Sequence, residues 1–134
     1  MNESKQVIVM RKDLNMRKGK MIAQGSHASM KVFLDRCEKD NYDGEMKKFT
    51  FYYKMNLSWD NWLNGRFTKV VLSCDSEQEL LELYQKAKDS NLPCALITDA
   101  GLTEFNGVPT NTCIAIGPAE PEEINIITGH LKLL

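Results

Sequence analysis

Apolar and polar positions follow one another along the chain in two patterns, one typical of strands and one typical of helices. Short apolar runs rich in β-branched residues are typical of strands buried in a sheet. Apolar residues at three- and four-residue steps predict amphipathic helices. The predicted strands are residues 6–10, 68–73, 94–98 and 112–117. The predicted helices, with their terminal residues, are 22–37, 58–65, 76–87 and 121–129.

Residues that start or stop helices support three of these predictions. Ser76 begins an S-x-x-E capping box, which indicates a helix N-terminus. Ser58 is a candidate N-cap for a short helix that carries two tryptophans. Pro121 suits the first position of the last helix, which Gly129 would end.

The predicted order β-α-α-β-α-β-β-α favours a single domain over residues 1–134, folded as a three-layer α/β/α sandwich. Strands joined by helices should run parallel through right-handed crossovers. A loop joins the third and fourth strands, so we expect these two antiparallel and the four-stranded sheet mixed but mostly parallel. Residues 40–57 show no clear period, and we expect the Trp and Tyr residues of 51–62 to lie in the core rather than to stack on bases.

The composition excludes some classes of protein, and the charge distribution suggests a partner. With 43% hydrophobic and 26% charged residues, the chain is neither disordered nor collagen-like. A net charge of -1 taken alone argues against nucleic acid as a partner. However, residues 1–70 hold 14 basic and 8 acidic residues, a balance of +6, whereas residues 71–134 hold 3 and 10, a balance of -7. The basic residues are densest over 11–20, which favours an anionic partner for one face, with ordinary solvated surface as the alternative.

Cysteine spacing and hydropathy bear on the cofactor and the compartment. The four cysteines, at positions 37, 74, 94 and 113, show no metal-ligand spacing, so we expect them reduced and structural, with no metal and no cofactor. No stretch approaches the roughly 20 apolar residues of a membrane span, and the first residues lack the apolar core of a signal peptide. We therefore expect a cytoplasmic protein with no membrane partner.

The predicted topology brings several polar residues to one edge of the sheet. In open α/β sheets, ligands bind beyond the carboxyl ends of the parallel strands. The first strand leads to a helix N-terminus near Lys20, where backbone N–H groups favour an anion, and His27 follows two turns later. The third strand leads to Asp99 and Thr103, and an antiparallel fourth strand would begin near Thr112 at the same edge. We expect these five residues to line one crevice.

Each of these residues also has a simpler interpretation. Asp99 can order its own turn through a side-chain hydrogen bond, Lys20 can be one more solvated cation, and His27 lies on the apolar stripe as a core residue would. Spacing alone therefore supports an anion-binding α/β domain with a Lys–Asp pair, and no more than that.

Several segments carry a family likeness. They are QVIVMRKDL (6–14), GK (19–20), AQ (23–24), HA (27–28), KVVL (69–72), TDAGLTE (98–104), AIGP (115–118) and GHLKLL (129–134), with Met16, Gly107, Thr110 and Thr112 between them. In these segments, in order and over nearly the whole chain, the sequence resembles the type II peptidyl-tRNA hydrolase family. The resemblance implies cleavage of the ester that joins a peptide to the terminal ribose of tRNA.

The resemblance also implies roles for the crevice residues. It assigns Lys20, His27, Asp99, Thr103 and Thr112 to catalysis. In chemical terms, Lys20 would stabilise the oxyanion or grip a phosphate, and Asp99 would position or deprotonate a water that the threonines help to orient. Which of these groups is the base stays open. The residues expected to bind substrate are Arg11, Lys12, Arg17, Lys18, Gln24, Thr98 and Thr110. The implied partner is tRNA, and the family is compatible with a homodimer.

The chain departs from the family pattern in three places. Residues 40–60 are longer and more aromatic than the usual connection, Gly25 stands where a small side chain or Cys is usual, and residues 109–112 alter the threonine-rich approach to the last strand. Two other classes of function stay open: a non-catalytic module that holds tRNA or a protein, and a small-molecule or nucleotide enzyme that uses the Lys–Asp crevice. The intact crevice residues favour the hydrolase.

Overall fold

The computed structural model describes residues 3–41, 49–52 and 56–134. All eight predicted strands and helices are present, and a hairpin that the sequence did not predict adds two short strands. In chain order the elements are β1 (Lys5–Arg11), α1 (Lys18–Leu34), β2 (Glu38–Asn41), β3 (Phe49–Tyr52), α2 (Leu57–Leu63), β4 (Lys69–Cys74), α3 (Glu77–Asp89), β5 (Cys94–Asp99), β6 (Thr110–Ala119) and α4 (Pro121–Thr128).

The main sheet has four strands in the order β4-β1-β6-β5. Strand β1 pairs parallel with β4 and antiparallel with β6, and β6 pairs antiparallel with β5. The predicted antiparallel pair and the mixed sheet are therefore confirmed. The expectation of mostly parallel pairing is wrong, because two of the three strand pairs described in this sheet are antiparallel. Strands β1, β4 and β5 do run in one direction, but β6 lies between β1 and β5, so β1–β4 is the one parallel pair among the described strands of this sheet.

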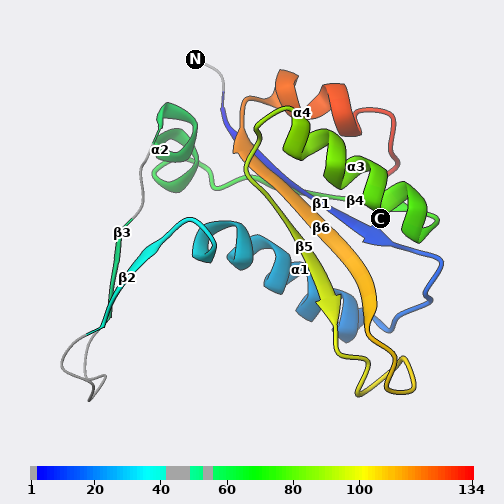
Figure 1. Ribbon diagram of the computed structural model, residues 1–134. Coiled ribbons are helices and arrows are strands. Elements are labelled where there is room, and N and C mark those ends of the chain that lie inside the picture. Colours follow the sequence, from blue (N-terminus) through cyan, green and yellow to red (C-terminus); the bar gives the residue numbers. More distant parts are fainter. Residues whose placement is uncertain (1–2, 42–48, 53–55) are drawn as a thin grey trace.

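Helices cover both faces of the sheet, which confirms the three layers (Figure 1). Helices α3 and α4 pack over a core that includes Val7 and Val9 of β1, whereas α1 and α2 pack over a second core that includes Ile8 and Met10. Alternate residues of β1 thus face opposite layers, as the two-residue period of a strand requires. Burial on both faces explains why this strand is apolar throughout.

Local capping decides where two of the helices begin. Ser76 accepts a hydrogen bond from the backbone N–H of Glu79 at 3.1 Å, as the capping box predicts. The predicted cap of α2 is wrong. Asn56 rather than Ser58 caps this helix, and its side chain accepts the N–H of Trp59 at 3.0 Å. Asparagine and serine are equally good N-caps. The sequence therefore gave no reason to prefer Asn56 over Ser58, two residues further on.

The hairpin of β2 and β3 forms a separate antiparallel sheet. Its strands are four residues long, β2 is polar throughout and β3 is too short for a clear period, which is why the apolar pattern missed them. Of the aromatic residues in 51–62, Trp59 and Trp62 are buried, which confirms their place in the core. The other aromatic side chains of that segment lie outside the residues described in detail. Across the described residues, no helix has the length and apolar character needed to cross a membrane.

Candidate active site

A lysine and a carboxylate meet at the carboxyl edge of the sheet. Asp99 is the last residue of β5, and Lys20 lies in the first turn of α1. The Lys20 Nζ atom lies 3.0 Å from Asp99 Oδ1 and donates a second hydrogen bond to Thr103 Oγ1 at 2.9 Å. Gln24, one turn further along α1, donates its amide to the same Asp99 oxygen at 3.1 Å. Three of the five expected crevice residues, together with the expected substrate-binding residue Gln24, therefore form one hydrogen-bonded cluster.

The second carboxylate oxygen of Asp99 orders the loop that carries Thr103. Asp99 Oδ2 accepts the backbone N–H of Gly101 at 2.9 Å. Gly101 has φ +82°, and a Cβ there would clash with the backbone oxygen of Val108. Glycine is therefore required for the loop to turn back on itself at this point. The turn-forming and the charge-pairing interpretations of Asp99 hold together, because each uses a different oxygen.

Thr112 contacts the cluster through Gln24, on the buried side. It is fully buried, and its hydroxyl donates to Gln24 Oε1 at 2.6 Å. Because that contact occupies the amide oxygen, the amide nitrogen of Gln24 faces Asp99. Thr112 therefore lies too deep to touch a substrate, and its expected catalytic role becomes a positioning role through Gln24.

The cluster keeps Asp99 ionised. The hydrogen bond from the Lys20 ammonium lowers the pKa of the Asp99 carboxyl below its ordinary value, and the Gly101 N–H and the Gln24 amide act in the same direction against the effect of partial burial. The side chains of Lys20 and Asp99 are 14% and 16% exposed. The charged pair is therefore sheltered but still open to solvent on one side.

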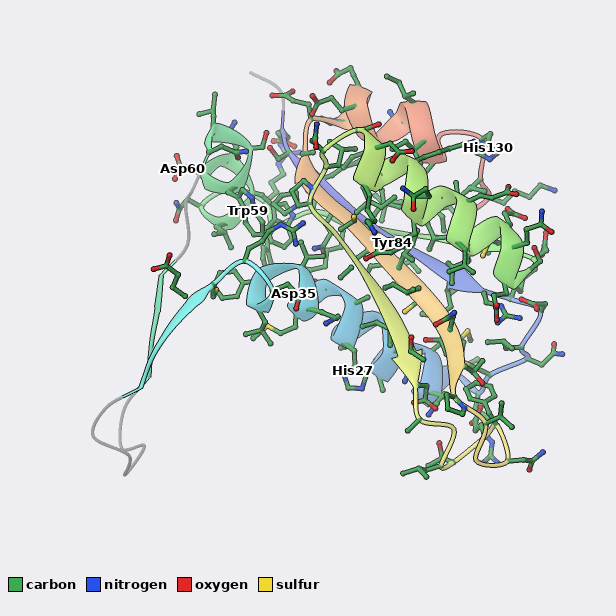
Figure 2. The ribbon with its side chains drawn as sticks, in the orientation of Figure 1. His27, Asp35, Trp59, Asp60, Tyr84 and His130 are labelled. Atoms are coloured by element: carbon green, nitrogen blue, oxygen red, sulfur yellow. The ribbon has the colours of Figure 1, made fainter. Side chains whose placement is uncertain are left out.

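His27 stands apart from this cluster. It is exposed and makes no side-chain hydrogen bond or ion pair with the described residues. Figure 2 shows it projecting outward from α1. Seven residues separate it from Lys20, so it lies on the same stripe of the helix but about 10 Å further along the axis. The structure thus places His27 where only an extended ligand could touch both it and Asp99.

Sequence comparison identifies the family of this chain. The sequence model described as peptidyl-tRNA hydrolase PTH2 matches residues 4–134. The chain belongs to the PTH2 family of peptidyl-tRNA hydrolases. It is 44% identical to the peptidyl-tRNA hydrolase of Methanocaldococcus jannaschii, over 97% of this chain and 99% of that protein. It is 42% identical to the enzyme of Methanopyrus kandleri and 39% identical to that of Thermococcus onnurineus, in both cases over 97% of each chain.

Arg11, an expected substrate-binding residue, makes its contacts within the protein. Arg11 is buried, and its guanidinium bonds both oxygens of Asp13, at 3.2 and 2.7 Å. It also donates to the backbone oxygen of Asn111 at 2.9 Å, and Glu77 lies 3.6 Å away. The strongest effect on the guanidinium is the Asp13 hydrogen bond, which raises its pKa. Arg11 therefore holds the end of β1 against the start of β6.

The other expected cations differ in where they point. Lys12 and Arg17 are exposed in the loop before α1, and Arg17 lies 3.5 Å from Glu104 of the loop that carries Thr103. Lys18 is exposed at the start of α1. Side chains two residues apart on a helix point about 160° away from each other. Lys18 therefore lies on the side of α1 opposite Lys20. Arg17 therefore remains near the loop of the cluster, whereas Lys12 lies at the end of β4, where its backbone N–H donates to the oxygen of Cys74 at 2.8 Å, and Lys18 lies on the other side of α1.

The two remaining expected residues stabilise the β5–β6 edge. The hydroxyl of Thr98 donates to Asn111 Oδ1 at 2.6 Å, and the hydroxyl of Thr110 donates to the backbone oxygen of Val108 at 2.8 Å. Asn111 was not predicted, although it joins Arg11 and Thr98 at the bulge between β5 and β6. A polar residue between two threonines at a strand start was the only signal for it.

Burial makes two of the cysteine thiols unreactive. Burial raises the pKa of Cys74 to about 11 and that of Cys113 to about 12, so both stay protonated at neutral pH. Cys113 Sγ instead donates to the backbone oxygen of Gln24 at 3.3 Å. Among the described residues, no three His, Cys, Asp or Glu side chains are grouped so that they could hold a metal ion.

We expect Thr112→Val to lower kcat about tenfold, equivalent to about 1.4 kcal/mol, with little change in KM. The variant keeps the shape of the side chain but removes the donor that orients Gln24, so the amide no longer faces Asp99 reliably. Steady-state kinetics of ester release measures this effect. Thr128→Val is the matched control, because Thr128 is equally buried but bonds within α4. Equal kinetics for the two variants would contradict the positioning role.

Proposed function

We propose that this chain hydrolyses the ester between the peptide and the terminal ribose of peptidyl-tRNA, and that residues 1–134 act as one domain. One observation carries the proposal: the Lys20 ammonium joins Asp99 and Thr103 in a half-sheltered cluster at the carboxyl edge of the sheet. Membership of the PTH2 family supports the reaction. It does not by itself assign these residues.

The reaction requires stabilisation of a developing negative charge. Water forms a bond to the ester carbonyl carbon, and the carbonyl oxygen becomes an oxyanion. The intermediate then breaks its bond to the ribose oxygen, which takes up the proton that the water loses. Lys20 is a preorganised cation next to solvent, and we assign it to the oxyanion, where such a charge contributes most.

Asp99 holds and orients the reacting groups rather than acting as a strong base. A carboxylate whose pKa is lowered accepts protons less readily than an ordinary one. Its remaining acceptor capacity suits the alignment of the attacking water. The exposed Thr103 hydroxyl accepts from Lys20, so its own hydrogen is available to a substrate oxygen. The ester of a peptidyl-tRNA is activated, and placement of the water accounts for much of the rate.

The tRNA is expected to lie along α1 and the loop before it. Lys12 and Arg17 are exposed in the loop before α1 and suit phosphate contacts. His27 lies on the same stripe of α1 as Lys20, where an extended substrate would reach it. The cytoplasm, as the compartment of translation, is the location that this substrate implies.

The direct test is a release assay with N-acetylated aminoacyl-tRNA as substrate. We expect the wild-type chain to release free tRNA and the N-acetylated amino acid at a rate far above spontaneous hydrolysis. Binding of the tRNA without release would instead indicate a non-catalytic module. Absence of both binding and release would exclude tRNA as the ligand.

Binding to a non-hydrolysable peptidyl-tRNA analogue is expected to weaken steeply with salt. Each phosphate contact releases counterions, and removal of one contact lowers the slope of log K against log[salt] by about 1. Lys12→Gln and Arg17→Gln should each reduce the slope by about that amount. Lys86→Gln, at the end of α3 on the other face of the sheet, is the control. A slope that is flat for the wild type would count against a phosphate backbone as the ligand.

A further inference from the structure

Strand β5 forms an open edge of the main sheet. It pairs with β6 on one side only, because the strand order is β4-β1-β6-β5 (Figure 1). Among residues 3–41, 49–52 and 56–134, no backbone group of another segment bonds its outer side. The Arg36 guanidinium reaches this edge at its amino end, where it lies 3.5 Å from the backbone oxygen of Cys94. The stretch from there to Asp99 has unpaired backbone groups.

The opposite edge of the sheet, at β4, is covered by the end of the chain. The backbone N–H of Ser73 donates to the oxygen of Lys132 at 2.9 Å, and that of Leu134 donates to the oxygen of Val71 at 3.1 Å. Natural sheets protect open edges with charges, prolines or a covering segment. Strand β5 carries neither a charge nor a proline before Asp99. Its edge is therefore suited to pairing with an added strand.

The pairing with β6 shows which backbone groups of β5 point outward. The backbone N–H of Gly117 donates to the oxygen of Pro93 at 2.7 Å, so Pro93 directs its backbone toward β6. Successive residues of an antiparallel strand direct their backbone groups to opposite sides. Leu96 and Thr98, three and five residues further on, therefore direct theirs outward. Each offers one N–H donor and one C=O acceptor to a neighbouring strand.

We propose that the peptide part of peptidyl-tRNA binds this edge as an added strand, parallel to β5; the inference rests on the proposed function. The reacting ester lies at Lys20 and Asp99, and Asp99 is the last residue of β5. The peptide is joined to the tRNA through its C-terminus. A peptide that extends from the ester back along β5 therefore has the same direction as β5. The outward groups of Leu96 and Thr98 bond its main chain.

The edge of β5 leads away from the expected position of the tRNA. In the proposed function, the phosphate contacts lie in the loop before α1. The peptide lies on the other side of the ester bond, so it needs a path in another direction. The outer side of β5 begins at Asp99 and provides this path.

Helix α1 runs beside the edge along the length of β5. Its first turn contacts Asp99 through Lys20, and Arg36, just after its end, reaches the other end of β5. His27 is exposed about 10 Å from Lys20 along the helix axis. About three residues of a strand cover the same distance, so His27 lies about level with Leu96. A peptide that extends along the edge therefore reaches both His27 and the cluster.

The length of β5 limits the peptide subsite. The strand has six residues, which an added strand of about five residues would follow at about 3.3 Å per residue. Main-chain groups are common to all peptides, so this mode of binding accepts different peptide sequences. Each hydrogen bond contributes roughly a two- to tenfold gain in affinity.

Release from a series of N-acetylated peptidyl-tRNAs that carry one to eight alanines tests the subsite. We expect kcat/KM to rise tenfold or more, in total, up to about five alanines and then to level off. Release that is equally fast for every length would overturn the subsite and leave the proposed function intact. Absence of release from every member of the series would overturn the proposed function, and the subsite with it.

N-methylation of the peptide tests the strand geometry. In a parallel ladder, every second residue directs its N–H toward the neighbouring strand. In five-alanine substrates that carry one N-methyl group each, kcat/KM should therefore fall about tenfold at every second position. The positions between them, whose N–H groups point to solvent, are the matched controls. An equal effect at all positions would overturn pairing as a strand.

A variant of β5 tests the protein side of the same bonds. Leu96→Pro removes one outward N–H, which an edge strand tolerates, and should lower the ratio of kcat/KM between five- and one-alanine substrates several-fold. Leu96→Ala, which shortens the side chain but keeps the N–H, should retain the wild-type ratio. Equal ratios for the two variants would contradict pairing at Leu96.

Amide hydrogen exchange of the wild type, followed by NMR, gives a test that does not depend on how the variants fold. The Leu96 and Thr98 amides should exchange more slowly when the protein binds a tRNA that carries five alanines through a 3′-amide. Uncharged tRNA, which lacks the peptide, should leave their exchange unchanged. Equal exchange with both tRNAs would overturn the subsite.

Discussion

Replacing Asp99 with Asn is expected to lower kcat for ester release by about 10³-fold, within the range of a lost electrostatic or acid–base group. In the wild type, both Asp99 oxygens are hydrogen-bond acceptors. Oδ1 accepts from Lys20 and Gln24, and Oδ2 accepts from the backbone N–H of Gly101. An amide must turn its NH₂ group toward one of these donors, so either Lys20 or the Gly101 loop loses its place.

The measurement is single-turnover release together with a thermal unfolding curve. Asp89→Asn is the matched control, because Asp89 is an exposed carboxylate at the end of α3 that also accepts a glutamine amide. We expect this control to keep wild-type kinetics. Activity of Asp99→Asn within a few-fold of the wild type would remove Asp99 from the site.

Replacing Lys20 with Met is expected to lower kcat by about 10²- to 10³-fold, the usual cost of removing one oxyanion-stabilising donor. The same change should raise the pKa of Asp99, since the Lys20 hydrogen bond is the main cause that lowers it. The acid limb of any residual activity should therefore move to higher pH. Lys86→Met serves as the control on α3.

The pKa shift also predicts how stability depends on pH. A carboxyl whose folded pKa is lowered stabilises the fold above its unfolded value, about 3.9 for Asp, and that contribution disappears as the pH falls through the lowered folded value. Lys20→Met should lose this contribution. The variant's free energy of unfolding should therefore be lower than that of the wild type at neutral pH, and the two values should converge in acid. A carbon-13 NMR titration of the Asp99 carboxyl measures the shift directly. The same Asp99 pKa in both proteins would contradict the pairing.

The central pair of the site was predictable because topology constrains it. Lys20 and Asp99 are 79 residues apart in the chain, yet each follows a strand that runs in the same direction. The ends of such strands share one edge of a sheet. The loop-joined antiparallel strand then returned Thr112 to that edge, as expected.

The depth and direction of each side chain were not predictable in this way. Thr112 and Thr103 looked alike in the sequence, but one is buried beneath Gln24 and the other is exposed beside Lys20. Lys18 and Lys20 looked alike as well, but they leave α1 on opposite sides. Such differences depend on which neighbours pack above and below, and spacing along the chain does not record them.

The sequence by itself determined three things: the strands and helices of the sandwich through local periodicity, the Lys20–Asp99 pair through strand direction, and the family through the motifs that the chain shares with it. Only the tertiary structure decided that β6 lies between β1 and β5, that Arg11 is bonded inside the protein, and that β5 is an edge strand of the main sheet. These features arise from contacts between segments distant in the chain. Such contacts are selected by the packing of the whole molecule.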